Sequence, residues 1–281
     1  LYSNTTGNSN SAIGWGSLTS STTGIENSAV GADTLNSNTT GYSNTAMGKS
    51  VLANSTSGYQ NSAIGVEALN KNKTGSGNTA AGYQAGYGVT AQSFSNNSLF
   101  GYQSGYVLTT GSNNMLFGYK AGDNLTTGSG NIVIGYDIDA PAVGSTQTLN
   151  IGNLIFGTGL DGSGTTLSTG KIGIGTTTPG AKLHIVGNAD DEQLVITANA
   201  TQSNTNPLVK FFKSDGTTEL LRIHSDDITN LFIGLNAGRV NSQVGGGENG
   251  LYNVFVGSNA GYSNTTGAWN TAVGRVSLYS N

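Results

Sequence analysis

The chain has 281 residues, of which 9% are charged and 44 are glycine, and its formal net charge is −4. Soluble domains carry roughly 25% charged residues and about 7% glycine, so this composition argues against an ordinary globular domain. With 11 basic and 15 acidic side chains, no basic patch indicates nucleic acid as a partner. Cysteine is absent, which excludes disulfides, thiolate metal ligands and a cysteine nucleophile.

Membrane and targeting signals are missing from this sequence. No apolar stretch approaches the roughly 18 residues of a membrane-spanning helix. No basic segment followed by an apolar one marks a signal peptide at the N-terminus. We expect no membrane insertion in this stretch of chain, and its sparsely charged polar surface favours an extracellular location.

Residues 1–136 repeat with a period of 17, which predicts a first β-solenoid array. The motif N-[ST]-A-x-G opens five successive coils. After a two-residue insertion, three more coils keep its asparagine and glycine around larger apolar residues. The asparagines are Asn10, Asn27, Asn44, Asn61, Asn78, Asn97, Asn114 and Asn131. The glycines are Gly14, Gly31, Gly48, Gly65, Gly82, Gly101, Gly118 and Gly135.

Two further columns keep the same period. Leucine stands four residues after the strand glycine in the early coils and glycine replaces it later, at Leu18, Leu35, Leu52, Leu69, Gly86, Gly105 and Gly122. A second column of glycines, each after a Thr or Ser, marks the other corner: Gly7, Gly24, Gly41, Gly58, Gly75, Gly111 and Gly128. Glycine permits positive φ, and Asn or Thr side chains bond their own backbone in turns. We therefore expect each coil to read strand, corner, strand, corner.

Such coils must stack, because each offers too few apolar side chains to offset its ordering entropy. Coils about 4.8 Å apart pair their strand backbones and align residues of one kind in columns. One such column is Ile13, Val30, Met47 and Ile64. The asparagines either form an amide-to-amide ladder, as in cross-β assemblies, or each caps its own turn. The pattern leaves both readings open.

Adjacent strand residues point to opposite faces, so one face fills the coil and the other is left outside. We expect the outer face to be the column Ala12, Ala29, Ala46, Ala63, Ala80, Leu99, Leu116 and Val133. Such an apolar stripe is too large to leave in water. We expect symmetric copies of the chain to cover it, giving a homo-oligomer.

The period fades over residues 137–229, which we assign to an inserted β module with hairpins. Residues 171–175 and 182–186 are expected strands around a Pro-Gly corner. Residues 208–212 and 219–223 flank an Asp-Gly step and are the expected second hairpin.

The solenoid signature returns at Asn230, Asn253 and Asn270, so residues 230–281 form a second β-solenoid array, truncated in mid-repeat. Residues 278–281 spell the same four letters as residues 1–4 and fall in the same column. We interpret the chain as a fragment of a longer fibre, with residues 1–277 as one unit of a super-repeat.

The tandem N-[ST]-A-[VI]-G motif with N-T-T-G corners resembles the head repeats of YadA-like trimeric autotransporter adhesins, and also phage tail fibres. Residues 173–179 followed by 182–185 are similar to a module of tail-fibre and large bacterial surface proteins. The resemblance implies a left-handed parallel β-roll assembled as a parallel homotrimer. It also implies a structural segment of an extracellular fibre that attaches to a host or surface, through a glycan or protein receptor. The 17-residue coil is longer than the usual adhesin head repeat.

Few side chains suit catalysis, and we expect no enzyme. His184 and His224 lie among aliphatic residues on expected strands, where a structural role is the simpler interpretation. Asp190, Asp191 and Glu192 offer carboxylates for glycan cleavage, or simply a solvated turn. A polysaccharide-degrading tailspike is therefore the alternative function.

No metal or cofactor is expected either. Asp161–Gly164 and Asp226–Asp227 carry possible calcium ligands but lack the alternating acids of a calcium loop. Gly173 and Gly175 precede no expected helix, so they are not a nucleotide-binding motif. Tyrosines recur near the corners, and either offer their faces to glycans or shield the coil ends: Tyr42, Tyr59, Tyr83, Tyr102 and Tyr119.

Overall fold

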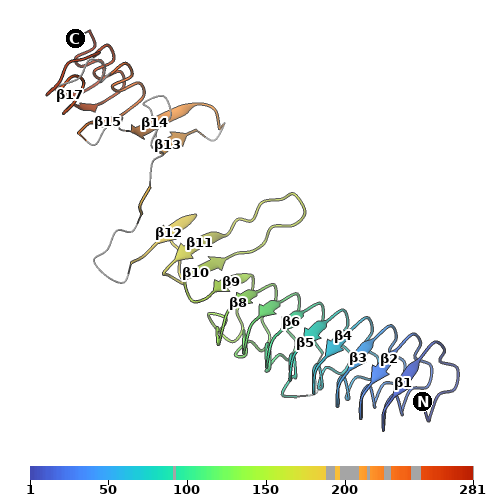
Figure 1. Cartoon of the computed structure of the whole chain (residues 1–281). Helices are drawn as coiled ribbons and strands as arrows, with labels where there is room; N and C mark the ends of the chain where they lie inside the picture. Colours follow the sequence, from blue (N-terminus) through green and yellow to red (C-terminus); the bar gives the residue numbers. More distant parts are fainter. Residues whose placement is uncertain are drawn as a thin grey trace. The chain divides into compact units, whose positions relative to one another are not determined.

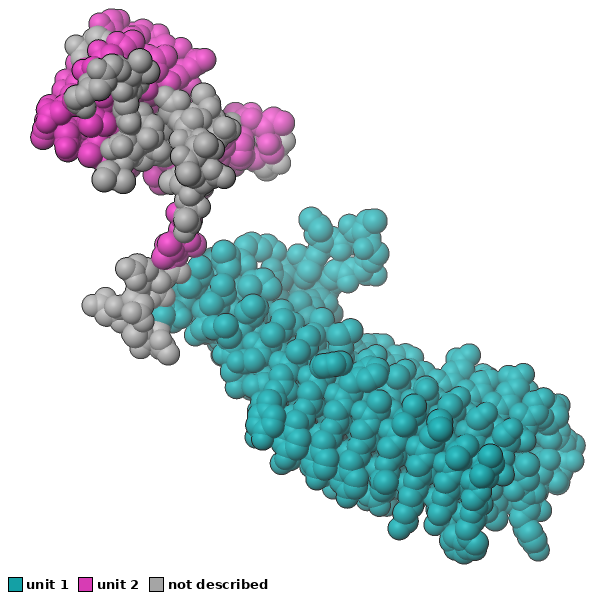
Figure 2. Space-filling model, in the orientation of Figure 1, with its two compact units in different colours: residues 1–193 teal, residues 194–281 magenta. Residues whose placement is uncertain are grey.

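The structure is a computed structural model that describes residues 1–90, 93–187, 194–196, 209–213, 216–224, 229–241 and 248–280. It divides into two compact units, Leu1–Gln193 and Leu194–Asn281, shown in different colours in Figure 2. Every regular element of the described residues is a β-strand, as expected of an all-β chain. Those residues include no helix with the length and apolarity to cross a membrane.

Eight coils of the first unit each place one three-residue strand in a single parallel sheet (Figure 1). The strands are β1 (Ser11–Ile13), β2 (Ser28–Val30), β3 (Thr45–Met47), β4 (Ser62–Ile64), β5 (Thr79–Ala81), β6 (Ser98–Phe100), β7 (Met115–Phe117) and β8 (Ile132–Ile134). Equivalent residues pair, for example Ala29 with Ala46, and the register survives the insertion, where Thr79 pairs with Ser98. The predicted parallel β-solenoid of 17-residue coils is confirmed.

The sheet of the first unit continues past the coils without a break. β9 (Thr148–Ile151) pairs in parallel with β8, and β10 (Ile155–Thr158) lies antiparallel to both β9 and β11 (Lys171–Ile174). β12 (Leu183–Ile185) then pairs with β11 in parallel. The two strands around the Pro-Gly corner are therefore present but do not form the expected hairpin, because the residues between them return the chain to the start of β11.

The second unit combines an antiparallel pair with three solenoid strands. β13 (Val209–Phe212) and β14 (Glu219–His224) are antiparallel, as the Asp-Gly step predicts. β14 is antiparallel to β15 (Leu231–Ile233), and β15, β16 (Val254–Val256) and β17 (Thr271–Val273) are parallel. The span 137–229 thus supplies β9–β12 to the first unit and β13–β14 to the second.

Each coil contains one strand rather than the expected two. The remainder is turns that still bond to the next coil, as where Thr22 N donates to Thr39 O at 3.0 Å. The corner glycines of the column that runs from Gly7 to Gly128 do not have positive φ. A Cβ on Gly24 would lie 2.5 Å from the carbonyl oxygen of Gly41 in the next coil. Close approach of neighbouring coils, and not backbone conformation, therefore requires glycine at this corner.

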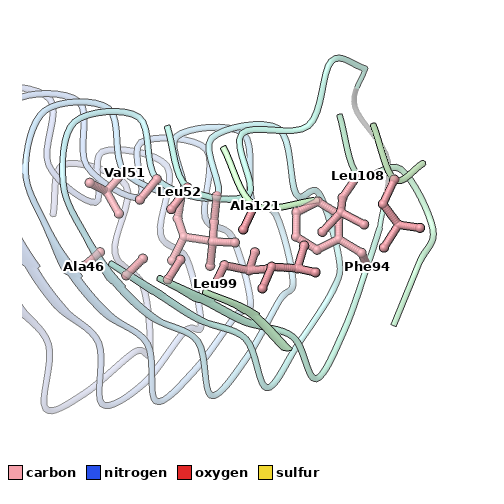
Figure 3. Packing of buried hydrophobic residues seen from close by; sticks show 14 of the residues in the cluster. Ala46, Val51, Leu52, Phe94, Leu99, Leu108 and Ala121 are labelled. Atoms are coloured by element: carbon pink, nitrogen blue, oxygen red, sulfur yellow. The ribbon is translucent and has the colours of Figure 1, made fainter. Parts of the chain in front are cut away.

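Three positions recur in the interior of each coil: the middle strand residue and the residues three and four places after the strand glycine. Later coils add Phe94, Leu108 and Leu125 (Figure 3). Where the middle strand residue is Ala46, the residue four places after the glycine is Leu52, and both are fully buried. Where the middle strand residue is Leu116, the residue four places after the glycine is Gly122, and a Cβ on Gly122 would lie 2.9 Å from Leu116 Cδ2. In the second unit the same exchange pairs Phe232 with Gly238 and Phe255 with Gly261. In these coils a larger residue at one of these two positions accompanies a smaller residue at the other, which keeps the packing density of the interior.

The strand face that fills the coil is the opposite of the expected one. The column that begins with Ala12 points inward and is buried from Ala29 onward, whereas Ile13 is 65% exposed and Met47 is 45% exposed. The physical reason is the inward leucine of each early coil, such as Leu35, which leaves room for no more than alanine across from it. The larger aliphatic column therefore lies outside.

The asparagine column is an amide ladder between coils. Asn44 Nδ2 donates to Asn27 Oδ1 at 3.0 Å and to Gly58 O at 2.8 Å. Asn44 Oδ1 in turn accepts from Asn61, from its backbone N at 3.0 Å and from its Nδ2 at 3.1 Å. The same bonds run from Asn10 to Asn131 and join Asn253 to Asn270. Of the two readings that the sequence left open, the structure selects the ladder.

We expect Asn44→Ala to lower the free energy of unfolding by about 3 kcal/mol, because it leaves several buried polar groups without partners. The control is Asn36→Ala, which removes one half-buried bond to Gly16 O and is expected to cost about 1 kcal/mol. Denaturant titration of both variants measures the difference. Equal losses would mean that the ladder has no special weight.

The volume exchange predicts a rescue. Leu116→Ala should cost about 3 kcal/mol by leaving a cavity, and Gly122→Leu alone should clash with Leu116. The double variant places at these two positions the residue pair found at Ala46 and Leu52, and Leu52 already adopts a φ of 51°. It is expected to regain most of the loss in a double-mutant cycle. Additive losses would refute the pairing of these two positions.

Candidate functional site

The first and third residues of β1–β8 point outward and form what we call the outer strand face. They are Ser11, Ile13, Ser28, Val30, Thr45, Met47, Ser62, Ile64, Thr79, Ala81, Ser98, Phe100, Met115, Phe117, Ile132 and Ile134. None is charged, although residues 1–136 contain charged side chains at Glu26, Asp33, Lys49, Glu67, Lys71, Lys73, Lys120 and Asp123. All of these charges lie on the turns. Depletion of charge with retention of apolar and aromatic residues is typical of the core of a protein interface.

The apolar column of this face stays in contact with water along the whole array. Ile64 is 50% exposed and Phe117 is 56% exposed. The face becomes aromatic toward β7, where the rings of Phe100 and Phe117 lie 5.9 Å apart. Monomeric proteins rarely expose contiguous apolar patches larger than a few hundred Å² without a binding role. The outer strand face is therefore the strongest candidate for a functional surface among the described residues.

Tyrosines form a second axial feature. The rings of Tyr83, Tyr102, Tyr119 and Tyr136 stack with centroids 5.1, 5.2 and 4.9 Å apart and planes within 13° of parallel. Each inner ring has neighbours on both faces, which leaves its edge and hydroxyl to solvent. The interpretation that tyrosine faces receive sugars thus suits only the ends of the stack, such as Tyr136, which is 75% exposed.

Asp123 and Asp139 form an acidic pair that the sequence interpretation missed. Burial raises the pKa of the Asp123 carboxyl, and the charge of Asp139 and a hydrogen bond to it raise that pKa further, against the opposing charge of Lys120. The available signal in the sequence was the separation of Asp123 and Asp139, which is close to the 17-residue period and indicates adjacent coils. Glycosidases hold their two carboxyls about 5–9.5 Å apart, so a pair in direct contact does not match that geometry.

Asp161, a possible calcium ligand, instead closes the loop between β10 and β11. Its carboxylate accepts from Ser168 Oγ at 3.0 Å, from Thr169 N at 2.7 Å and from the Thr169 hydroxyl. These hydrogen bonds lower the pKa of Asp161 to about 2. Across the ranges that the structure describes, no group of three or more His, Asp or Glu side chains is arranged to hold a metal ion.

The remaining candidates are not brought together. His184 lies on β12, and its Nδ1 accepts from Gly180 N at 3.1 Å, a structural role. Asp190, Asp191, Glu192, Asp226 and Asp227 lie outside the described residues. An open hollow of about 360 Å³ adjoins the β10–β11 loop, and its lining of Thr158, Gly159, Thr169, Gly170, Lys171, Thr177, Thr178 and Pro179 contains no carboxylate.

Comparison with known proteins supplies no name or function for the outer strand face. No family model, curated protein or solved structure matches the chain. The likeness to adhesin heads and tail fibres therefore rests on the repeat motifs alone.

Asp123 predicts a pH effect. Its raised pKa means that the folded state disfavours the ionised carboxyl, so its contribution is most favourable below the ordinary value of 3.8 and is lost as the pH rises through the raised value. We expect Asp123→Asn to increase the free energy of unfolding at pH 7 and to give no gain near pH 3. Urea titrations at the two pH values test this. A gain that persists at the lower pH would point to packing by the amide instead.

Proposed function

We propose that this chain is a structural segment of an elongated extracellular fibre that attaches to a host or surface, and that copies of it associate through the outer strand face. The observation that carries the proposal is an uncharged face with an exposed apolar column, displayed on a continuous ladder. The face supplies a contact surface, and the ladder supplies the rigidity that a fibre needs.

The ladder supports the structural part of the proposal. In a solenoid each coil contacts its neighbours, so stability accumulates along the axis and the length is set by the number of coils. The asparagine amides and the backbone bonds of the turns, such as that of Thr39 N to Thr56 O at 2.8 Å, join every coil to the next. A stiff, sparsely charged rod is suited to holding a binding end away from an anchor.

The outer strand face supports self-association. Its columns have the same spacing in every copy, so two copies aligned along their axes match coil for coil, as symmetric assemblies require. A parallel homotrimer of left-handed rolls is the arrangement implied by the resemblance to YadA-like heads. In that arrangement the columns of Ile64 and Phe117 lie against their counterparts and leave water.

Attachment is proposed for the surfaces that remain outside this contact. The turns present serine, threonine and asparagine side chains and the half-exposed tyrosine hydroxyls, which are donors and acceptors suited to a glycan or protein receptor. We do not advance the polysaccharide-degrading alternative. Within the described residues the contacting pair Asp123 and Asp139 and the acid-free hollow near β11 give it no support.

We expect Ile64→Lys to weaken self-association at least tenfold in dissociation constant, about 1.4 kcal/mol, because it places a charge in the contact. Val66→Lys is the matched control: Val66 is 40% exposed, lies two residues away and is outside the outer strand face. Sedimentation velocity at micromolar concentration measures both. An unmodified chain that sediments as a monomer, or equal effects of the two lysines, would contradict the proposal.

A further inference from the structure

Tyr42 and Tyr59 occupy equivalent positions of consecutive coils, each directly after a corner glycine. Their ring centroids are 4.8 Å apart and their planes differ by 2°. Tyr42 is 40% exposed and Tyr59 is 39% exposed, so both phenols touch each other and solvent. Two accessible phenols in face-to-face contact are the reactants of oxidative phenol coupling.

The fold holds this pair together. The Tyr42 carbonyl accepts from Gln60 N at 3.0 Å, directly beside the pair, and Thr39 Oγ1 donates to Thr56 O at 3.0 Å in the preceding turn. Adjacent parallel strands are about 4.8 Å apart, the same spacing as the rings. The two phenols therefore cannot separate widely without breaking the contacts between coils.

We propose that Tyr42 and Tyr59 are a modification site at which a peroxidase-type one-electron oxidant joins consecutive coils by a dityrosine bond. Each phenol loses one electron and one proton and becomes a phenoxyl radical. The two radicals form one carbon–carbon bond at the positions ortho to oxygen, and the displaced ring hydrogens return to the oxygens. One hydrogen peroxide takes up the two electrons and two protons and yields two waters.

Proximity directs the coupling to this pair. Groups held in contact react at effective concentrations far above those of separate molecules. Tyr2 provides the contrast, because it is 92% exposed but belongs to no stacked pair of the described residues. Access alone would favour Tyr2, whereas geometry favours Tyr42 with Tyr59. The stack that begins at Tyr83 and Tyr102 extends the same chemistry to later coils.

The test is peroxidase oxidation of the full chain followed by trypsin. Lys49 is the first basic residue, so Tyr42 falls in peptide 1–49 and Tyr59 in peptide 50–71, which ends at Lys71. We expect these two peptides joined, lighter by two hydrogens than their sum, in a yield that stays constant over about a hundredfold range of protein concentration. Mixing isotope-labelled and unlabelled chains should give no mixed product, which separates coupling within one chain from coupling within an oligomer.

Phenylalanine variants decide which phenols react while keeping the stacked rings. Tyr59→Phe should abolish the joined product, and Tyr2→Phe should leave it unchanged. Oxidation in urea should lower its yield several-fold, because the ladder no longer holds the pair. The proposal is overturned if the product persists in Tyr42→Phe through Tyr2, if mixed labels appear in it, or if it does not form in the folded chain.

Discussion

Hydrogen bonding between successive coils is the interaction on which the rest of this structure depends. A coil has one three-residue strand and an interior as small as Ala46, Val51 and Leu52, too little to fold alone. Asn44 joins three coils through the partners of its single amide. Because these bonds place residues 17 apart in adjacent coils, side chains at equivalent positions align in columns along the solenoid axis. The outer strand face, the tyrosine stacks and the contacts of the corner glycines all follow from that constraint.

The interior adapts to sequence change while the ladder stays constant. The coils of Ala12, Ala29, Ala46 and Ala63 combine alanine with leucine, those of Leu99 and Leu116 leucine with glycine, and those of Phe232 and Phe255 phenylalanine with glycine. The two-residue insertion is absorbed in a similar way. Phe94 is buried after it, and a Cβ on Gly86 would lie 2.5 Å from Leu99 Cδ1 and 2.8 Å from Leu69 Cδ2, with the Phe94 ring in ordinary contact at 3.6 Å. Because the sizes of the interior side chains compensate for one another, the outer strand face keeps the same position from coil to coil. The same surface can therefore extend over many coils of differing sequence.

Much of this arrangement could be predicted, because the period of 17 fixes the heights of Asn27, Gly31 and their equivalents. The assignment of strand faces could not be made from alternation, since both candidate columns, that of Ala29 and that of Val30, are apolar. The informative signal was the exchange between leucine and glycine four residues after the strand glycine, which shows which column it packs against. The parallel pairing of β11 and β12 was missed for a different reason. A Pro-Gly step specifies a local turn and not where the chain returns.

Paired cysteines give the most direct test of the stacking, since the chain has none of its own. Ser28 and Thr45 are register partners on adjacent strands, within the roughly 4.4–6.8 Å between Cα atoms that a disulfide spans. Ser11 and Thr45 share the column but lie two coils apart, beyond that span. We predict that oxidation closes a disulfide in the Ser28→Cys and Thr45→Cys chain and not in the Ser11→Cys and Thr45→Cys chain. Closure of the second pair as readily as the first would contradict the ladder.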